Sequence, residues 1–254
     1  MSMLWWSLGL LGVDGLLAVA YPTVRDNHEL DRTFAGLPAS VQAMLALHGG
    51  STLTSPIGYL DSQFFANVLP VMLLVFAIGV AAWAIAGDEA DGTLELLLAN
   101  PINRTRVAAE RALGLLLLVA ALVAVTAAGM VLMAAPVGLD RGLPPARIVA
   151  AVVATALLAL AYAALAFAVG AATGRRGVAV AVASALAVAQ FLIEGLAEQV
   201  RVLRPLREVS PWHWLLGGDP LRAGLTWHSG LLPLVTAVML MGIGNILFRR
   251  RDLA

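Results

Sequence analysis

Six long apolar segments recur along the sequence, and they constrain what the chain can fold into more than any other feature. Each is close to the ~20 mostly apolar residues that an α-helix needs to cross a bilayer. Glycine and alanine are frequent within them, and small residues let membrane helices pack closely. The sequence therefore predicts an all-α, polytopic membrane protein, a single domain over residues 1–254, with six transmembrane helices and short amphipathic interfacial helices. The predicted spans are residues 4–21, 64–86, 108–135, 147–172, 178–198 and 229–248.

The composition agrees with a membrane protein and excludes several functions. Charged residues make up 13% of the chain, whereas a soluble domain carries about 25%. The formal net charge is zero, which gives no electrostatic basis for binding nucleic acid. Cysteine is absent, so disulfides and thiolate catalysis are excluded. The four histidines show no ligand spacing, and no metal site is expected.

The distribution of arginine predicts the orientation of the spans. An even number of spans places both termini on one side of the membrane. Arg175, Arg176 and the run 249–251 directly follow helix ends on that side, and positive charge at helix ends marks the cytoplasm. Segment 4–21 lacks the basic residues that begin a signal peptide, and Asp14 interrupts it, so we interpret it as a retained span. The missing basic residues also suggest the hypothesis that translation begins upstream of Met1.

One charged segment, "GDEADGTLELLLANPINRTR" at residues 87–106, separates the second and third spans. Within it, Leu94, Leu97 and Leu98 share one helical face. Thr93 can cap the helix, and the residue before Pro101 avoids the α region, which ends it. The pattern predicts a short surface helix, joined to two spans, that can transmit force from a docked partner. A solvated loop with its leucines at the membrane interface is the alternative.

This segment resembles the corresponding segment of ABC-2 type transporter permeases. The matching residues are Glu89, Gly92, Thr93, Leu94, Glu95, Leu96, Leu97, Leu98, Pro101 and Arg104. Three further stretches resemble the family in order: "YPTVRDN" at 21–27, "SPIGYLDSQFF" at 55–65, and "LRPLREVSPWHWLLGGDPLRAGL" at 203–225. The chain departs from the family in lacking a basic amphipathic segment at its N-terminus.

The resemblance implies a half-transporter of the bacterial cytoplasmic membrane with both termini in the cytoplasm. Two permeases, identical or different, would pair above two ATPase subunits and export a substrate at the expense of ATP. This chain has no GxxxxGK phosphate loop, so ATP and Mg²⁺ would bind to the ATPase, and the permease would be neither an enzyme nor a cofactor protein. Residues 87–104 would form the coupling helix. The coupling residues would be Glu89, Gly92, Thr93, Glu95, Leu98, Pro101 and Arg104.

Polar residues inside the spans are candidates for the substrate pathway. Asp14 lies near the middle of the first span, and a lone acid there costs about 2.5–3.5 kcal/mol, so it should face protein or a water-filled cavity. Gln190 and Glu194 lie one turn apart in the fifth span. A buried hydrogen bond for Asp14, and a position at the interface for Glu194, are the alternatives.

Two further interpretations concern the segment before the last span. Residues 203–225 are too polar to cross the membrane alone, and they act either as an outer gate or as interface packing. Trp5, Trp6, Trp212, Trp214 and Trp227 are typical of interfacial aromatic belts. For the whole chain, a membrane scaffold or assembly factor without transport is an alternative function. A secondary transporter is another, although it would need more ionisable residues within the helices.

Overall fold

The computed structural model describes residues 3–36, 52–84, 86–87, 104–197 and 200–250. Six of its helices are long and apolar enough to cross a membrane, and each overlaps one predicted span. These described residues contain no β-strand, so the predicted all-α, polytopic fold is confirmed. The six are Met3–Arg25, Pro56–Ala84, Thr105–Val137, Pro145–Thr173, Arg176–Leu196 and Trp227–Arg250.

The first half of the chain contains six described elements, of which all but α2 belong to the first three spans. Helix α1 is followed by the short helix α2, and the second span contains one wide π-helical turn, η1. In order, these elements are α1 (Met3–Arg25), α2 (His28–Ala35), α4 (Pro56–Leu60), η1 (Asp61–Phe65), α5 (Val68–Ala84) and α8 (Arg104–Val137).

A short turn joins the fourth and fifth spans, and a run of short helices separates the fifth span from the sixth. A π-helical turn, η3, begins the final span. In order, these elements are α9 (Pro145–Thr173), α10 (Arg176–Leu196), η2 (Arg201–Leu203), α11 (Arg204–Glu208), α12 (Pro211–Leu216), α13 (Pro220–Ala223), η3 (Trp227–Leu231) and α14 (Leu232–Arg250).

Two predicted spans end too early, both directly before a proline, and the second span begins at Pro56, before the predicted residue 64. Helix α1 runs through Pro22 to Arg25, so "YPTVRDN" begins inside the helix, and α8 includes Pro136. A proline in the last turn removes only one backbone hydrogen bond. Near Pro22, the Thr23 hydroxyl donates to the Ala20 carbonyl at 2.7 Å. Helices α1 and α8 therefore continue for four and two residues beyond the predicted ends.

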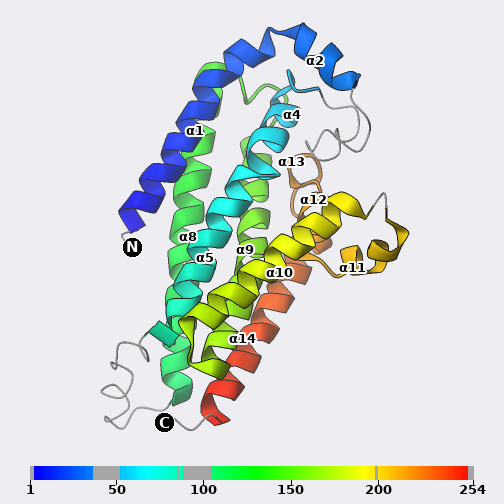
Figure 1. Cartoon of the computed structure of the whole chain (residues 1–254). Helices are drawn as coiled ribbons and strands as arrows, with labels where there is room; N and C mark the ends of the chain where they lie inside the picture. Colours follow the sequence, from blue (N-terminus) through cyan, green and yellow to red (C-terminus); the bar gives the residue numbers. More distant parts are fainter. Residues whose placement is uncertain (1–2, 37–51, 85, 88–103, 198–199, 251–254) are drawn as a thin grey trace.

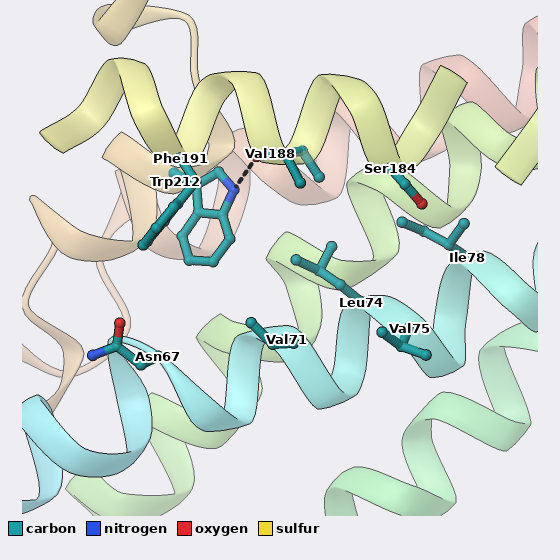
Figure 2. A pocket seen from close by; sticks show the side chains of 10 residues that line it. Asn67, Val71, Leu74, Val75, Ile78, Ser184, Val188, Phe191 and Trp212 are labelled. Atoms are coloured by element: carbon teal, nitrogen blue, oxygen red, sulfur yellow. Dashed lines mark hydrogen bonds between the residues drawn. The ribbon is translucent and has the colours of Figure 1, made fainter. Parts of the chain in front are cut away.

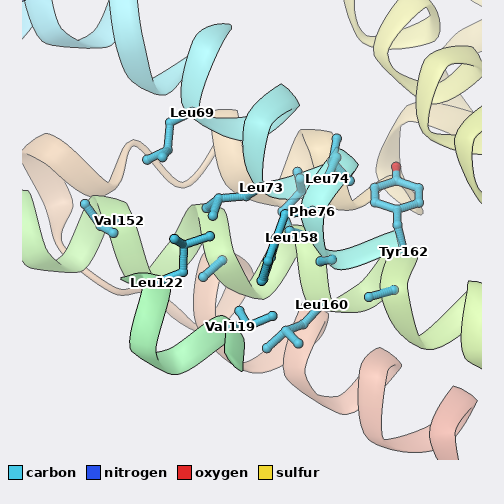
Figure 3. Packing of buried hydrophobic residues seen from close by; sticks show 14 of the residues in the cluster. Leu69, Leu73, Leu74, Phe76, Val119, Leu122, Val152, Leu158, Leu160 and Tyr162 are labelled. Atoms are coloured by element: carbon cyan, nitrogen blue, oxygen red, sulfur yellow. The ribbon is translucent and has the colours of Figure 1, made fainter. Parts of the chain in front are cut away.

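Helix α9 is the centre of the bundle: four of the other spans pack against it, while α1 packs on α8 (Figure 1). It packs most extensively on α14 and α5, and also on α10 and α8. Alanines along α9 let these helices approach closely. Figure 3 shows part of this core, where Leu73 and Phe76 of α5 lie beside Leu158 of α9 and Leu122 of α8.

The bundle has two chemically different ends. We call the end with α2, α4 and α13 the distal end, and the end where α14 finishes the proximal end (Figure 1). Hydroxyl groups fix α1 to the distal beginning of the second span and to the residues just before it. Tyr59 donates to the Leu17 carbonyl at 3.0 Å, and Tyr21 donates to the Thr54 carbonyl at 3.2 Å. At the proximal end, Gly174 adopts a left-handed φ of 65° in the sharp turn between α9 and α10.

Candidate functional site

An apolar groove lies between α5 and α10. Its volume is about 310 Å³, within the range of small-molecule sites. The side chains of Val75 and Val188 are more than half exposed, so the groove opens toward the surface of the bundle. Figure 2 shows its walls, and Asn67 and Ser184 are the polar members. The lining residues are Asn67, Val71, Leu74, Val75, Ile78, Ser184, Ala187, Val188, Phe191 and Trp212.

The wide turn η1 positions the polar side chain at the distal end of this groove. Asn67 follows η1 directly, and its Nδ2 donates to the Ser62 carbonyl at 3.0 Å. Wide π-helical turns are frequent at functional sites because they displace the residues around them. Asn67 is therefore held at the start of α5, where the apolar wall begins.

Trp212 of α12 closes the distal end of the groove. Its side chain is only 2% exposed, and its Nε1 donates to the Ala187 carbonyl at 3.0 Å (Figure 2). The indole also packs on Phe191, with ring centroids 4.9 Å apart. The predicted place of Trp212 in an interfacial belt is wrong, because α12 folds back over α10 and buries the ring.

Gln190 and Glu194 face the segment that carries Trp212. The Oε1 atom of Gln190 accepts a short hydrogen bond from the Tyr162 hydroxyl of α9, and Ser210 lies 3.5 Å away. Glu194 is 8% exposed, and its Oε1 lies 2.9 Å from Nη2 of Arg207 and 3.2 Å from Nδ1 of His213. Both predicted pathway residues thus bind the distal segment.

Sequence reasoning did not find the partners of Gln190 and Glu194. Tyr162 is in the middle of an apolar helix, and Arg207 and His213 are in the stretch 203–225, whose resemblance to the family assigns no contact to either residue. One signal was present: an acid and an amide at i, i+4 spacing in an apolar helix, which require buried partners. The basic residues of 201–207 were the available counter-charges.

Asp14 lies elsewhere, between α1 and α8. Its side chain is fully buried, and neither oxygen accepts a hydrogen bond from a described residue, so the predicted buried hydrogen bond is not found there. A methyl group added at Gly129 of α8 would lie 3.0 Å from its Oδ2, so this glycine makes room for the carboxylate. In the part of the chain described, α1 packs mainly on α8, and Asp14 is not brought together with Gln190 or Glu194.

Most of the predicted coupling residues lie outside the described residues. These are Glu89, Gly92, Thr93, Glu95, Leu98 and Pro101. Arg104 is the first residue of α8, and its side chain is outside the described set. Because α5 ends and α8 begins at the proximal end (Figure 1), the segment between them connects the groove-lining helix α5 to α8.

Comparison with known sequences identifies the class of protein. The ABC-2 family transporter protein model matches residues 10–253, nearly the whole chain. The chain therefore belongs to the ABC-2 transporter family, and its predicted membership is confirmed. No curated protein matches the chain. Members of this family are in general non-catalytic membrane subunits that associate with an ABC ATPase.

Proposed function

We propose that this chain is the permease subunit of an ATP-driven exporter in a bacterial cytoplasmic membrane. The match to the ABC-2 family over residues 10–253 is the observation that carries the proposal, and the six candidate spans support it. A second permease pairs with it, and ATPase subunits bind ATP and Mg²⁺ beneath it. Both termini face the cytoplasm, so the distal end faces outward.

The groove between α5 and α10 is the proposed path for the substrate. Its apolar lining favours an apolar or amphipathic compound, and Asn67 and Ser184 offer two fixed polar contacts. The exposed side chains along the groove allow a substrate to enter sideways from the lipid. Gln190 and Glu194 lie beside the distal end of this path, whereas Asp14 faces α8 and contributes no wall to it.

Coupling to ATP hydrolysis is proposed to pass through residues 87–104. Glu89 and Glu95 contact the ATPase, with Arg104 as the basic counterpart. Because α5 both lines the groove and precedes this segment, a displacement of the segment reaches the groove along one helix. No rearrangement of the central helix α9 is required.

Co-purification and ATP hydrolysis test this proposal. The chain is expressed with the Walker-motif ATPase encoded nearest to its own gene, and the complex is reconstituted in lipid vesicles. We expect the two subunits to co-elute, the permease to stimulate hydrolysis, and ATP to drive accumulation of a fluorescent apolar dye in inverted vesicles. Dye uptake driven by an ion gradient without ATP would instead indicate a secondary transporter. A stable chain that binds no ATPase would indicate a scaffold.

Replacing the two acids tests the coupling segment itself. An exposed charged contact is worth up to about 1 kcal/mol, so Glu89→Ala with Glu95→Ala should weaken ATPase docking by about five- to thirtyfold. Glu29→Ala with Asp140→Ala removes two exposed acids from distal parts of the chain and is the matched control. Equal stimulation by both double variants would contradict the role of the segment.

A further inference from the structure

One face of α10 carries the hydrogen bond and the ring contact that fix Trp212 over the groove. Residues 187, 190, 191 and 194 follow the i, i+3, i+4, i+7 spacing of a single helical stripe. The Ala187 carbonyl and the Phe191 ring bind Trp212, and Gln190 lies near Ser210. Residues 201–216, comprising η2, α11 and α12, lie against this stripe, and α12 also packs on α9, η3 and α14. We call residues 201–216 the lid.

The charged contacts of this lid converge on a single buried atom. Oε1 of Glu194 lies 3.0 Å from Nε and 2.9 Å from Nη2 of Arg207, and 3.2 Å from Nδ1 of His213. We call these three residues the clasp. A buried carboxylate requires such partners, since its burial without them is costly. Separation of the lid from α10 would remove both partners from Glu194 at once.

His213 makes the clasp sensitive to protons. Its second ring nitrogen, Nε2, lies 3.9 Å from Oε2 of Glu208, so the ring stands between two carboxylates. Neutral imidazole can donate to only one of them, whereas the protonated ring donates from both nitrogens. Together, the three clasp residues and Glu208 have a net charge of −1 when His213 is neutral. Their net charge is zero when His213 is protonated.

Among the described groups on elements that pack on α12, no other group competes with Glu194 and Glu208 for contact with the His213 ring. Arg207 shares Glu194 with it, Tyr162 is bound to Gln190, and His228 stacks on Trp227. The titratable residues on the elements that pack against α12 are Arg147, Tyr162, Arg176, Glu194, Arg204, Arg207, Glu208, His228, Arg249 and Arg250. Among these, Glu194 and Glu208 lie within 4 Å of the imidazole.

We propose that the clasp of Glu194, Arg207 and His213 holds Trp212 across the distal end of the groove, and that protonation of His213 tightens this closure. Closing the lid therefore takes up a proton. Acid favours the closed lid, and rising pH favours the open lid. The device deepens the proposed function by giving the export path a proton-regulated outer gate.

Quenching of a fluorophore by tryptophan measures this closure directly. The chain has no cysteine, so Val188→Cys provides a single labelling site in the groove wall, and this position is more than half exposed and has room for a label. A bimane at this site is quenched when Trp212 lies over it. Trp212→Phe at each pH supplies the unquenched reference and subtracts the effect of the other tryptophans.

We expect strong quenching at pH 5.5 that is progressively relieved toward pH 8. Glu194→Gln should raise the open-to-closed ratio by about tenfold, as expected for loss of one hydrogen bond to a charged group. His213→Asn should abolish the pH dependence, while His228→Asn, which alters a second distal histidine, should keep it.

An unchanged pH profile in His213→Asn, or quenching in Glu194→Gln equal to that of the parent, would overturn the inference. If Glu194→Gln does not fold, the comparison of His213→Asn with His228→Asn still tests the inference. The assay uses neither ATP nor an ATPase. A negative quenching result would therefore contradict the clasp without contradicting the proposed export function. A negative ATPase result would contradict the export function without contradicting the clasp.

Discussion

Gly244 on α14 lies at the tightest point of the largest helix interface, and replacing it by alanine gives a quantitative test of the bundle. A Cβ at this position would lie 3.0 Å from the Ala168 Cα and 3.0 Å from Cδ1 of Phe167 on α9. Favourable carbon contacts are about 3.5–4.0 Å long. Ala168 contributes a backbone atom and Phe167 is buried, so neither can rotate away and α14 must move outward.

The loss of folding stability in Gly244→Ala is best measured against the same substitution at Gly242, a second glycine on α14. Overpacking a tight core costs about 1–3 kcal/mol, whereas alanine is favoured over glycine inside a helix by about 1 kcal/mol. A Cβ at Gly242 would meet nothing within 4 Å. Gly242→Ala therefore gains only the helix preference of alanine over glycine. Gly244→Ala gains the same preference but adds the cost of overpacking, so it should be less stable than Gly242→Ala by about 1–3 kcal/mol.

Equilibrium unfolding of the purified protein in mixed micelles, followed by circular dichroism, measures both variants against the parent. The expected order of the unfolding midpoints is Gly242→Ala highest and Gly244→Ala lowest. Equal midpoints for the two variants would refute the close approach of α14 to α9.

Three other substitutions test two buried polar groups and one strained backbone position by the same unfolding assay. Asp14→Asn should raise the midpoint, because it keeps the side-chain volume and removes a carboxylate without a described partner; a lower midpoint would mean that the carboxylate has one. Tyr162→Phe should cost about 1 kcal/mol through the lost hydrogen bond to Gln190, and no change would argue against that bond. Asp219 has a φ of 38°, so Asp219→Val should be about 1–2 kcal/mol less stable than Asp219→Asn, and equal stabilities would contradict this backbone conformation.

The spans were predictable from sequence because the length and apolarity needed to cross a bilayer leave few alternatives. Their ends were less predictable. The predicted first and third spans end directly before Pro22 and Pro136, yet a proline in a final turn removes only one hydrogen bond. The position of the spans around α9 depends on which faces carry small residues, and a hydropathy pattern alone does not assign those faces to partners.

The candidate site was predictable only in part, because its contacts join residues that are distant in the sequence. Gln190 and Glu194 stand out as polar residues in an apolar helix, but their partners come from α9 and from a segment with no periodic pattern. Trp212 was assigned to the interface because tryptophans flanking spans usually lie there. The return of α12 over α10, which buries that ring, depends on contacts that are distant in sequence.

The central position of α9 has a consequence for how the protein is made. Its most extensive neighbour, α14, follows the other five spans along the chain. Membrane helices insert first and associate afterwards, so the alanine-rich face of α9 that receives Gly244 has no partner until α14 has been synthesised. A chain that stops before α14 retains five insertable spans but leaves that face open to lipid or to a foreign helix. Assembly of the bundle, and protection from membrane quality control, are thereby deferred until the sixth span has been made.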